Sequence, residues 1–278
     1  MAGDIVKGII GDGIPTELIL TAVTKNTERN SSDLYVACKT QERCNQLREE
    51  FNARAVTDPM EFLPNVKILV IALPFGENIE AELIKINKKI PNDTLVVSCT
   101  YGLTLKLLEK YFPGHPVIRA MMNQMILVGA GVCIYAVGSV KPADADMMAQ
   151  FFLSQLGKTI KMSSDEELEL AGDLIIGSTM YSLLAINSLI EGANNKGLQI
   201  DKSTEIVSQV YKGVSKFVVE SDEVIESLFK HFADNKKFVE RGKEILMNYD
   251  ILSIMQNKLP KTDEKEIFKF HYHWNKQR

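Results

Sequence analysis

The sequence has few of the residues that mark secreted proteins. Only four of its 278 residues are cysteines, and no two of them have CxxC spacing. Three of the four lie among apolar residues typical of strands, so we expect reduced, buried thiols. The N-terminus also lacks the charged and then apolar pattern of a signal peptide, because Asp4 and Lys7 interrupt it. These features predict a cytoplasmic location. The cysteines are Cys38, Cys44, Cys99 and Cys133.

An excess of positive charge is also missing. The formal net charge is -4, so no broad basic face for nucleic acid is expected. No apolar run approaches the ~20 residues that cross a bilayer, so we expect no membrane span. Apolar residues make up 45% of the chain, which is ordinary for a globular protein, and the length suffices for two domains.

Several catalytic motifs are absent as well. The sequence contains neither a Gly-x-Ser-x-Gly elbow nor an HExxH helix, so a hydrolase is not supported. His271 and His273 have the alternation of metal ligands, but no cysteine or third histidine follows nearby. We therefore expect no metal site.

The first twenty residues contain a pattern that suits a nucleotide. The apolar residues 6–10 predict a strand, Gly11 and Gly13 predict a tight turn, and a helix pattern follows. A helix N-terminus after a Gly-x-Gly turn offers unpaired N–H groups to pyrophosphate. Thr16 replaces the third glycine of the dinucleotide fingerprint. Its hydroxyl could still form a cap or contact a phosphate, but its bulk opposes close packing of helix on strand. The alternative is a strand–turn–helix without a ligand. The expected contacts are Gly11, Asp12, Gly13, Ile14 and Pro15.

The end of the second predicted strand, residues 33–37, indicates which dinucleotide binds. Enzymes that use NAD commonly place a carboxylate here to hold the ribose 2′-hydroxyl. This chain has Lys39 and Thr40 instead, with Arg43 one turn further on. A cation beside a hydroxyl suits a 2′-phosphate, so NADP is favoured over NAD. The alternative is a solvent-exposed helix start.

Strands and helices alternate over the first 160 residues. The continuous apolar run at 67–73 is typical of a parallel strand covered on both faces. We predict a doubly wound, mostly parallel α/β sheet of Rossmann type over residues 1–162. Further strands are expected at 94–99, 117–121, 132–137 and 159–162, and helices at 40–52, 77–88, 103–110 and 143–156.

Residues 163–278 predict an all-helical C-terminal domain. Its first helix, 166–195, is apolar nearly all round and therefore needs cover that one small bundle does not provide. We accordingly expect a homodimer or a higher homo-oligomer. Further helices are predicted at 203–219, with Thr204 as a cap, and at 222–232 and 238–255.

Residues 117–132 resemble the segment V-x-R-x-M-P-N-T-P-x-x-V-G-x-G-V of the pyrroline-5-carboxylate reductase family. Ile10, Gly11 and Gly13 match the I-G-x-G of that family, and residues 72–74 correspond to its A-V-K-P. The tail at 268–273 is similar to a divergent branch, the late-competence proteins of Gram-positive bacteria. The matching residues of the middle segment are Arg119, Met121, Asn123, Val128, Gly129, Gly131 and Val132.

The resemblance implies an NADP-dependent oxidoreductase that reduces a cyclic imine by hydride transfer, as in proline biosynthesis. Asn123 is expected to bond the nicotinamide carboxamide, or alternatively to cap a turn. Ser178 or Thr179 is expected to donate to the imine nitrogen, or alternatively to a carbonyl one turn back. Lys236 or Lys237 could pair with the substrate carboxylate, or form a solvated helix start. Further cofactor contacts are expected at Ala72, Leu73 and Pro74.

The segments aligned with the substrate motifs of the family depart from them. The family's S-G-S-G-P-A-Y corresponds to residues 175–181, where Gly177, Ser178 and Tyr181 are kept. Its S-P-G-G-T-T corresponds to residues 234–239, and a family glutamate falls on Asn187. The sequence therefore also supports a second hypothesis, a non-catalytic, reductase-like binding or regulatory protein.

Overall fold

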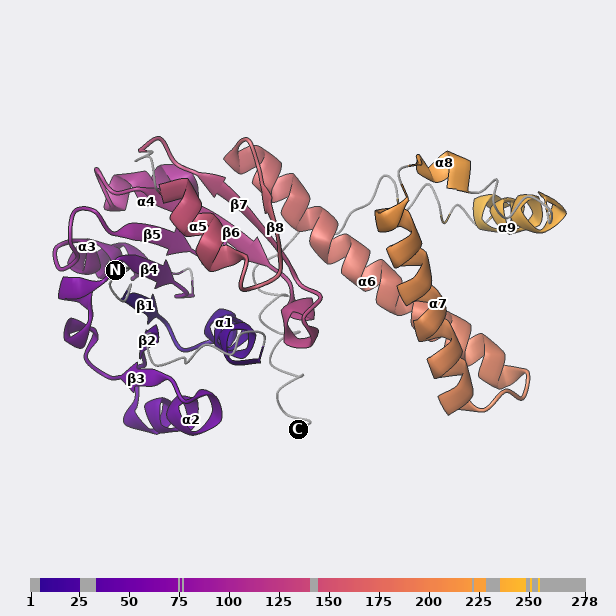
Figure 1. Ribbon diagram of the computed structural model, residues 1–278, viewed down its shortest axis with the longest axis horizontal. Coiled ribbons are helices and arrows are strands. Elements are labelled where there is room, and N and C mark those ends of the chain that lie inside the picture. The colour runs from indigo at the N-terminus through magenta and orange to yellow at the C-terminus, as the bar shows by residue number, and fades with distance from the viewer. Residues whose placement is uncertain are drawn as a thin grey trace. The chain divides into compact units, whose positions relative to one another are not determined.

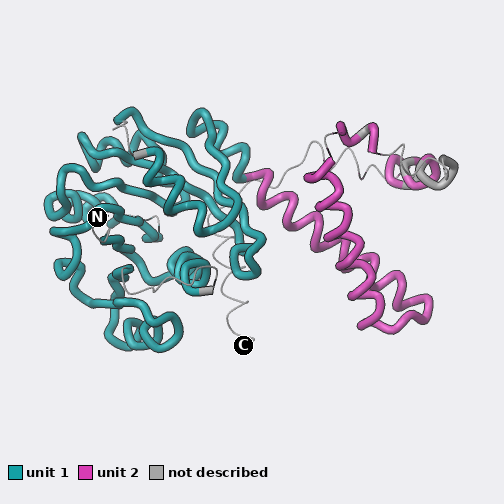
Figure 2. The backbone as a smooth tube through the Cα atoms, in the orientation of Figure 1, with its two compact units in different colours: residues 1–172, 262–278 teal, residues 173–261 magenta. Residues whose placement is uncertain are grey.

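The computed structural model describes residues 6–25, 34–74, 76, 78–140, 145–221, 223–228, 236–248, 251 and 255. These residues form two compact units, which divide between Gly172 and Asp173, within one long helix (Figure 2). The predicted tail at 268–278, including His271 and His273, lies outside the described residues.

The first unit contains an eight-stranded sheet with the order β3-β2-β1-β4-β5-β6-β7-β8 (Figure 1). Neighbouring strands are parallel except for β6 and β7, which pair antiparallel. The doubly wound, mostly parallel sheet predicted from the sequence is thus confirmed. The strands are β1 (Lys7–Ile10), β2 (Leu34–Ala37), β3 (Arg54–Val56), β4 (Ile68–Ile71), β5 (Leu95–Ser98), β6 (Val117–Met122), β7 (Val132–Val137) and β8 (Lys158–Lys161).

Helices cover both faces of this sheet (Figure 1). One hydrophobic cluster joins α1, α2 and α5 to the sheet, and a second joins α3 and α4 to its other face. Every residue of β4 and β5 is buried, as a parallel strand between two helical layers requires. The bounds are α1 (Ile14–Lys25), α2 (Gln41–Phe51), α3 (Ile79–Asn87), α4 (Leu105–Tyr111) and α5 (Ala145–Leu153), with short 3₁₀ helices η2 (Pro59–Glu61), η3 (Leu63–Asn65) and η4 (Gln124–Val128).

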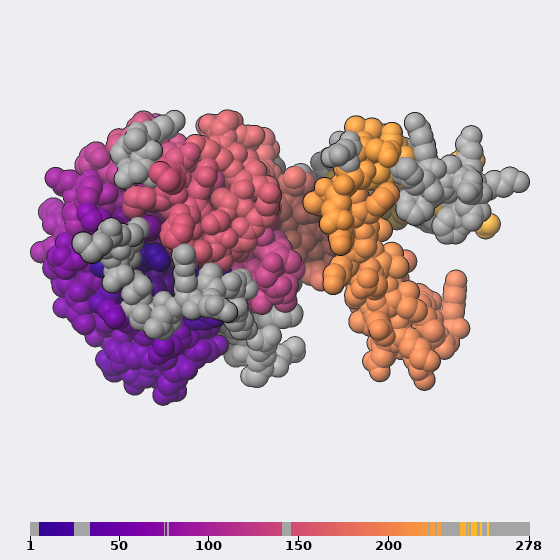
Figure 3. Space-filling model, in the orientation of Figure 1, coloured from indigo at the N-terminus to yellow at the C-terminus, as the bar shows by residue number. Residues whose placement is uncertain are grey.

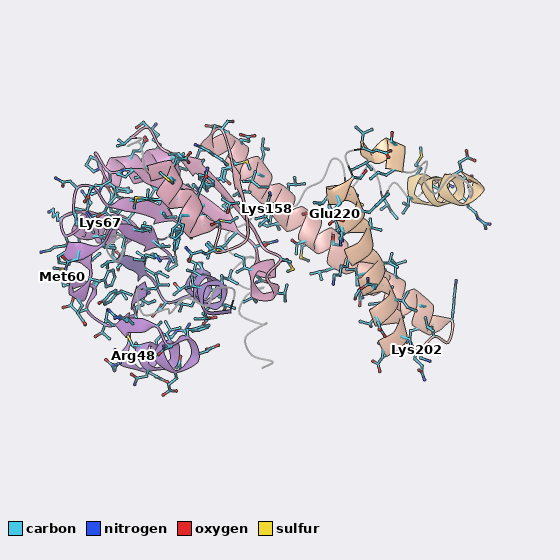
Figure 4. All side chains as sticks on the ribbon, in the orientation of Figure 1. Arg48, Met60, Lys67, Lys158, Lys202 and Glu220 are labelled. Carbon is cyan, nitrogen blue, oxygen red and sulfur yellow. The ribbon has the colours of Figure 1, made fainter. Side chains whose placement is uncertain are left out.

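Strand β3 was not expected from the sequence. It has three residues, too few to show the periodicity of a strand. Its place beside β2 is held by Arg48, labelled in Figure 4, whose Nε donates to the Ala55 carbonyl at 2.9 Å. A tertiary contact therefore defines this edge of the sheet.

The helices that follow are α6 (Asp165–Asn195), α7 (Ile200–Glu220), α8 (Ile225–Leu228) and α9 (Lys236–Asn248). The expectation that Thr204 caps the second of them is wrong, because α7 begins four residues earlier. The Thr204 hydroxyl donates instead to the Ile200 carbonyl at 2.8 Å. Gln199 takes the cap position.

Helix α6 also corrects the expectation about apolar runs. By length and composition it could cross a membrane. Its most apolar 18 residues have a mean hydropathy of 1.4, and 11% of those residues are buried. Core helices of soluble proteins can have the same length and composition. Among the described residues α6 is the one helix with this length and composition.

A buried charge ties the first turn of α6 to the sheet. Arg119 of β6 is 1% exposed, and its Nη1 lies 2.9 Å from Oδ1 of Asp165. Glu169, one turn further along α6, forms a second ion pair with Nη2. The other oxygen of Asp165 accepts a hydrogen bond from the Leu105 N–H at 3.1 Å, at the start of α4. One carboxylate thus fixes the start of two helices.

Removal of the Asp165 carboxylate leaves the half-exposed Glu169 as the remaining ion-pair partner of the buried guanidinium among the described residues. We expect Asp165→Ala to lower the free energy of unfolding by about 3 kcal/mol in urea titration. Asp93→Ala is the matched control, because Asp93 pairs with Lys67 (Figure 4) at the surface and should contribute less than about 1 kcal/mol. Equal losses of unfolding free energy in the two variants would show that the buried pair contributes no more than the surface pair.

Candidate dinucleotide-binding site

The turn after β1 is held against the end of β4. Gly11 has a φ of +121°, and a Cβ at this position would lie 2.3 Å from the Ala72 carbonyl oxygen. The Ala72 N–H in turn donates to the Ile10 carbonyl at 2.9 Å. Only glycine fits here, for reasons of both conformation and space. Strand order reverses between β1 and β4, and such switch points are where doubly wound sheets bind ligands.

Thr16 fits this turn in a way that the sequence did not indicate. Its side chain is completely buried, and its hydroxyl donates to the Gly11 carbonyl at 2.8 Å. The residue that replaces the third glycine therefore braces the turn from inside. Its hydroxyl proton is used there and is not directed at a phosphate.

Gly13 lies at the outer side of the same turn and is exposed. A Cβ on Gly13 would meet no atom closer than Cδ of Pro15, at 4.0 Å. The N–H groups of the first turn of α1, which begins at Ile14, have no partner within the helix. This combination of an open glycine and a helix N-terminus fits a pyrophosphate.

Lys39 and Thr40 lie at the carboxyl end of β2, next to this turn. The Lys39 N–H donates to Oδ2 of Asp12 at 2.9 Å, and the Lys39 side chain is exposed. Thr40 caps α2, since its Oγ1 accepts the Arg43 N–H at 3.2 Å. The Thr40 hydroxyl proton is thereby left to donate. Arg43, which the sequence also placed here, bonds the Asp12 carbonyl and Glu17 instead of projecting freely.

The ends of β4 and β6 lie further along the same edge of the sheet. Leu73 is buried in the hydrophobic core, whereas Pro74 is exposed. Thr100 was not anticipated from the sequence: it is buried, and its hydroxyl donates to the Leu73 carbonyl at 2.9 Å. The sequence signal that could have indicated Thr100 is a hydroxyl residue directly after a predicted buried strand. Asn123 accepts the Val132 N–H on Oδ1 at 3.0 Å, which orients its amide and leaves Nδ2 as a donor.

The predicted substrate residues belong to the second unit. The hydroxyls of Ser178 and Thr179 both donate to the Ile175 carbonyl, at 3.1 and 2.7 Å. This is the alternative role considered for them. Lys236 and Lys237 begin α9, and their side chains lie outside the described part of the chain.

Thiols and metal ligands add no chemistry to this edge of the sheet. All four cysteines are unpaired. Burial, with a hydrogen bond to Cys44, raises the pKa of Cys38 to about 12, which keeps this thiol protonated near neutral pH. Within the described residues no group of three or more His, Cys, Asp or Glu side chains is placed to hold a metal ion.

The fold and the turn at Gly11 and Gly13 define a doubly wound protein of the dinucleotide-binding class. No protein-family model matches the chain. A pyrroline-5-carboxylate reductase of Synechocystis is 26% identical over 217 residues, covering 78% of this chain and 80% of the relative. The chain is thus a divergent relative of these reductases.

Solved structures agree with this fold. The pyrroline-5-carboxylate reductase of Coxiella burnetii has a TM-score of 0.81 at 19% identity, covering 92% of this chain and 95% of its own. The Plasmodium falciparum pyrroline carboxylate reductase, solved with NADP bound, has a TM-score of 0.78 at 18% identity, covering 91% and 93%.

The two glycines of the turn should respond differently to the same substitution. Gly11→Ala should destabilise the protein by about 1–3 kcal/mol from conformation alone, with a further loss from contact with Ala72. Gly13→Ala should change stability by less than about 0.5 kcal/mol, yet weaken stabilisation by NADPH, because its methyl group enters the open side. Thermal unfolding with and without NADPH measures both effects. Equal stability losses would contradict the geometry of the turn.

Proposed function

We propose that this chain is an NADP-dependent oxidoreductase that reduces a cyclic imine of the pyrroline-5-carboxylate type by hydride transfer. The observation that carries the proposal is the turn after β1, where Gly11 packs on Ala72 and Gly13 leaves its outer side open. The sequence similarity to a Synechocystis pyrroline-5-carboxylate reductase supports the choice of substrate class.

We also propose a cytoplasmic location, and domains of residues 1–162 and 163–278.

Residues at the carboxyl edge of the sheet suit each part of the cofactor, which supplies the hydride when bound. Gly13 and the first turn of α1 would hold the pyrophosphate. Lys39 and Thr40 would contact the 2′-phosphate through an ammonium and a hydroxyl proton. Nδ2 of Asn123 would donate to the nicotinamide carboxamide. Main-chain atoms of residues 11–15 and 72–74 would complete the contacts.

For the substrate we propose Ser178 and Thr179 as donors near the imine nitrogen. Reduction of a C=N bond requires a proton on nitrogen as well as a hydride on carbon, and a positioned hydroxyl can donate the hydrogen bond. Each hydroxyl would have to turn away from the Ile175 carbonyl, to which it donates in the structure. Lys236 or Lys237 would pair with a substrate carboxylate.

A second candidate is a reductase-like protein that binds the dinucleotide without this activity. The observations that favour it are the loss of glycines and threonines at residues 234–239 and the hydroxyl bonds within α6. Both candidates require an open turn at Gly13, so only turnover separates them.

NADPH should stabilise the protein by about 2.7 kcal/mol at a hundredfold excess over its dissociation constant. At the same concentration NADH should stabilise it less. Lys39→Ala should reduce this difference between NADPH and NADH. The reduction should be smaller at high salt, because salt screens the exposed charge of Lys39. NADPH oxidation with pyrroline-5-carboxylate then tests the enzyme. Binding without turnover would support the second candidate, and no stabilisation by either dinucleotide would reject both.

We further propose that the second unit forms a homodimer. The residues Ile206, Val210, Val214 and Phe217 recur at helical spacing along α7, and each is at least 41% exposed. Figure 3 shows the side chains of this helix, in orange, at the surface, and Lys202 and Glu220 mark its two ends in Figure 4. An apolar stripe of this length normally contacts a partner. A second copy of the chain, as the apolar α6 also suggests, would bury both.

Sedimentation at micromolar concentration should therefore give a dimer. Val210→Glu should shift the protein toward monomer, because a charge would be buried at the interface. Ser208→Glu adds the same charge at another exposed position of α7 and serves as the control. A monomeric wild type, or equal behaviour of the two variants, would reject this interface.

A further inference from the structure

Asp12, between the two glycines, is bonded to two separate residues of the β2–α2 segment. Its carboxylate Oδ2 accepts the main-chain N–H of Lys39 at 2.9 Å. Its carbonyl oxygen accepts two hydrogen bonds from Arg43, from Nε at 3.1 Å and from Nη2 at 2.9 Å. The turn that would receive the pyrophosphate is thereby linked to the segment that would receive the 2′-phosphate.

Arg43 serves this link and is not free to bind a phosphate. Its Nη2 also pairs with the Glu17 carboxylate, and both side chains are about three-quarters buried. Its Nη1 donates to Gln46 at 3.3 Å. With most of its N–H groups in use, Arg43 fixes the position of Asp12. This leaves Lys39 as the exposed cation at the end of β2.

We propose that Asp12 is a positioning residue for the choice of cofactor. By holding the Lys39 main chain, its carboxylate directs the Lys39 ammonium toward the 2′-phosphate that distinguishes NADP from NAD. This inference rests on the proposed NADP-dependent function. A carboxylate beside the glycine turn repels the pyrophosphate of both dinucleotides equally, but its repulsion of the 2′-phosphate acts on NADP alone and opposes the selectivity. Two variants that both remove this charge separate the repulsion from the effect of the hydrogen bond to the Lys39 N–H.

The test is the ratio of the dissociation constants for NADH and NADPH, measured by titration calorimetry on the full chain. Asp12→Ala removes the acceptor for the Lys39 N–H, so the ratio should fall by about tenfold, the effect of one lost charge-assisted contact. Asp12→Asn keeps a carbonyl oxygen as acceptor and should keep the ratio within about threefold of wild type. The conservative variant thus rescues selectivity, although both variants remove the same charge.

A double substitution shows whether Asp12 acts through Lys39. Lys39→Ala alone should also lower the ratio, and adding Asp12→Ala should lower it no further, because the two changes remove one interaction. Additive losses, an unchanged ratio in Asp12→Ala, or equal ratios in Asp12→Ala and Asp12→Asn would each overturn the inference. Failure of the wild type to bind either dinucleotide would instead reject the proposed function.

If Asp12→Ala does not fold, Arg43→Lys provides a second measurement. A lysine ammonium keeps the charge but does not reproduce the guanidinium fork that bonds Asp12 and Glu17 together. The ratio should fall in this variant as well, since the Asp12 main chain is released. An unchanged ratio in a folded Arg43→Lys variant would overturn the inference.

Discussion

The contact between Gly11 and Ala72 is the constraint on which the candidate site depends. It occurs where β1 and β4 lie side by side and the winding of the sheet reverses. Because the main chains meet without a side chain between them, the turn is directed outward and Gly13 stays open. Thr16 fills the space beneath the turn with a hydroxyl that is bonded to the Gly11 carbonyl. The site is therefore a consequence of backbone packing, to which side chains add specificity.

A second constraint acts at the other end of the sheet. Arg119 is an unusual residue for the interior of a strand, because a guanidinium is costly to bury without partners. Asp165 and Glu169 compensate its charge from one face of α6, spaced four residues apart. Within the first unit, the start of α6 is thus tied to β6, the strand whose end carries Asn123.

The sequence was most informative where structure depends on neighbours along the chain. The apolar run at 67–73 predicted β4, and the turn at Gly11 and Gly13 was predicted with its helix. Prediction failed where a particular hydrogen bond, which the pattern of residues does not show, decides the outcome. β3 is held by Arg48, and the start of α7 lies before Thr204, whose hydroxyl bonds its own helix. The sequence also gave no reason to expect that Thr16 supports the glycine turn.

By itself, the sequence determined the element types, the doubly wound class and the residues available to a dinucleotide. These follow from side-chain periodicity and from the conformational freedom of glycine, which are local properties. Only the tertiary structure decided which donors meet which acceptors. Arg43 reaches Asp12 across 31 residues, and Arg119 reaches Asp165 across 46. The physical reason is that strand order and register bring such groups together, and neither is encoded in the spacing of the two residues along the chain.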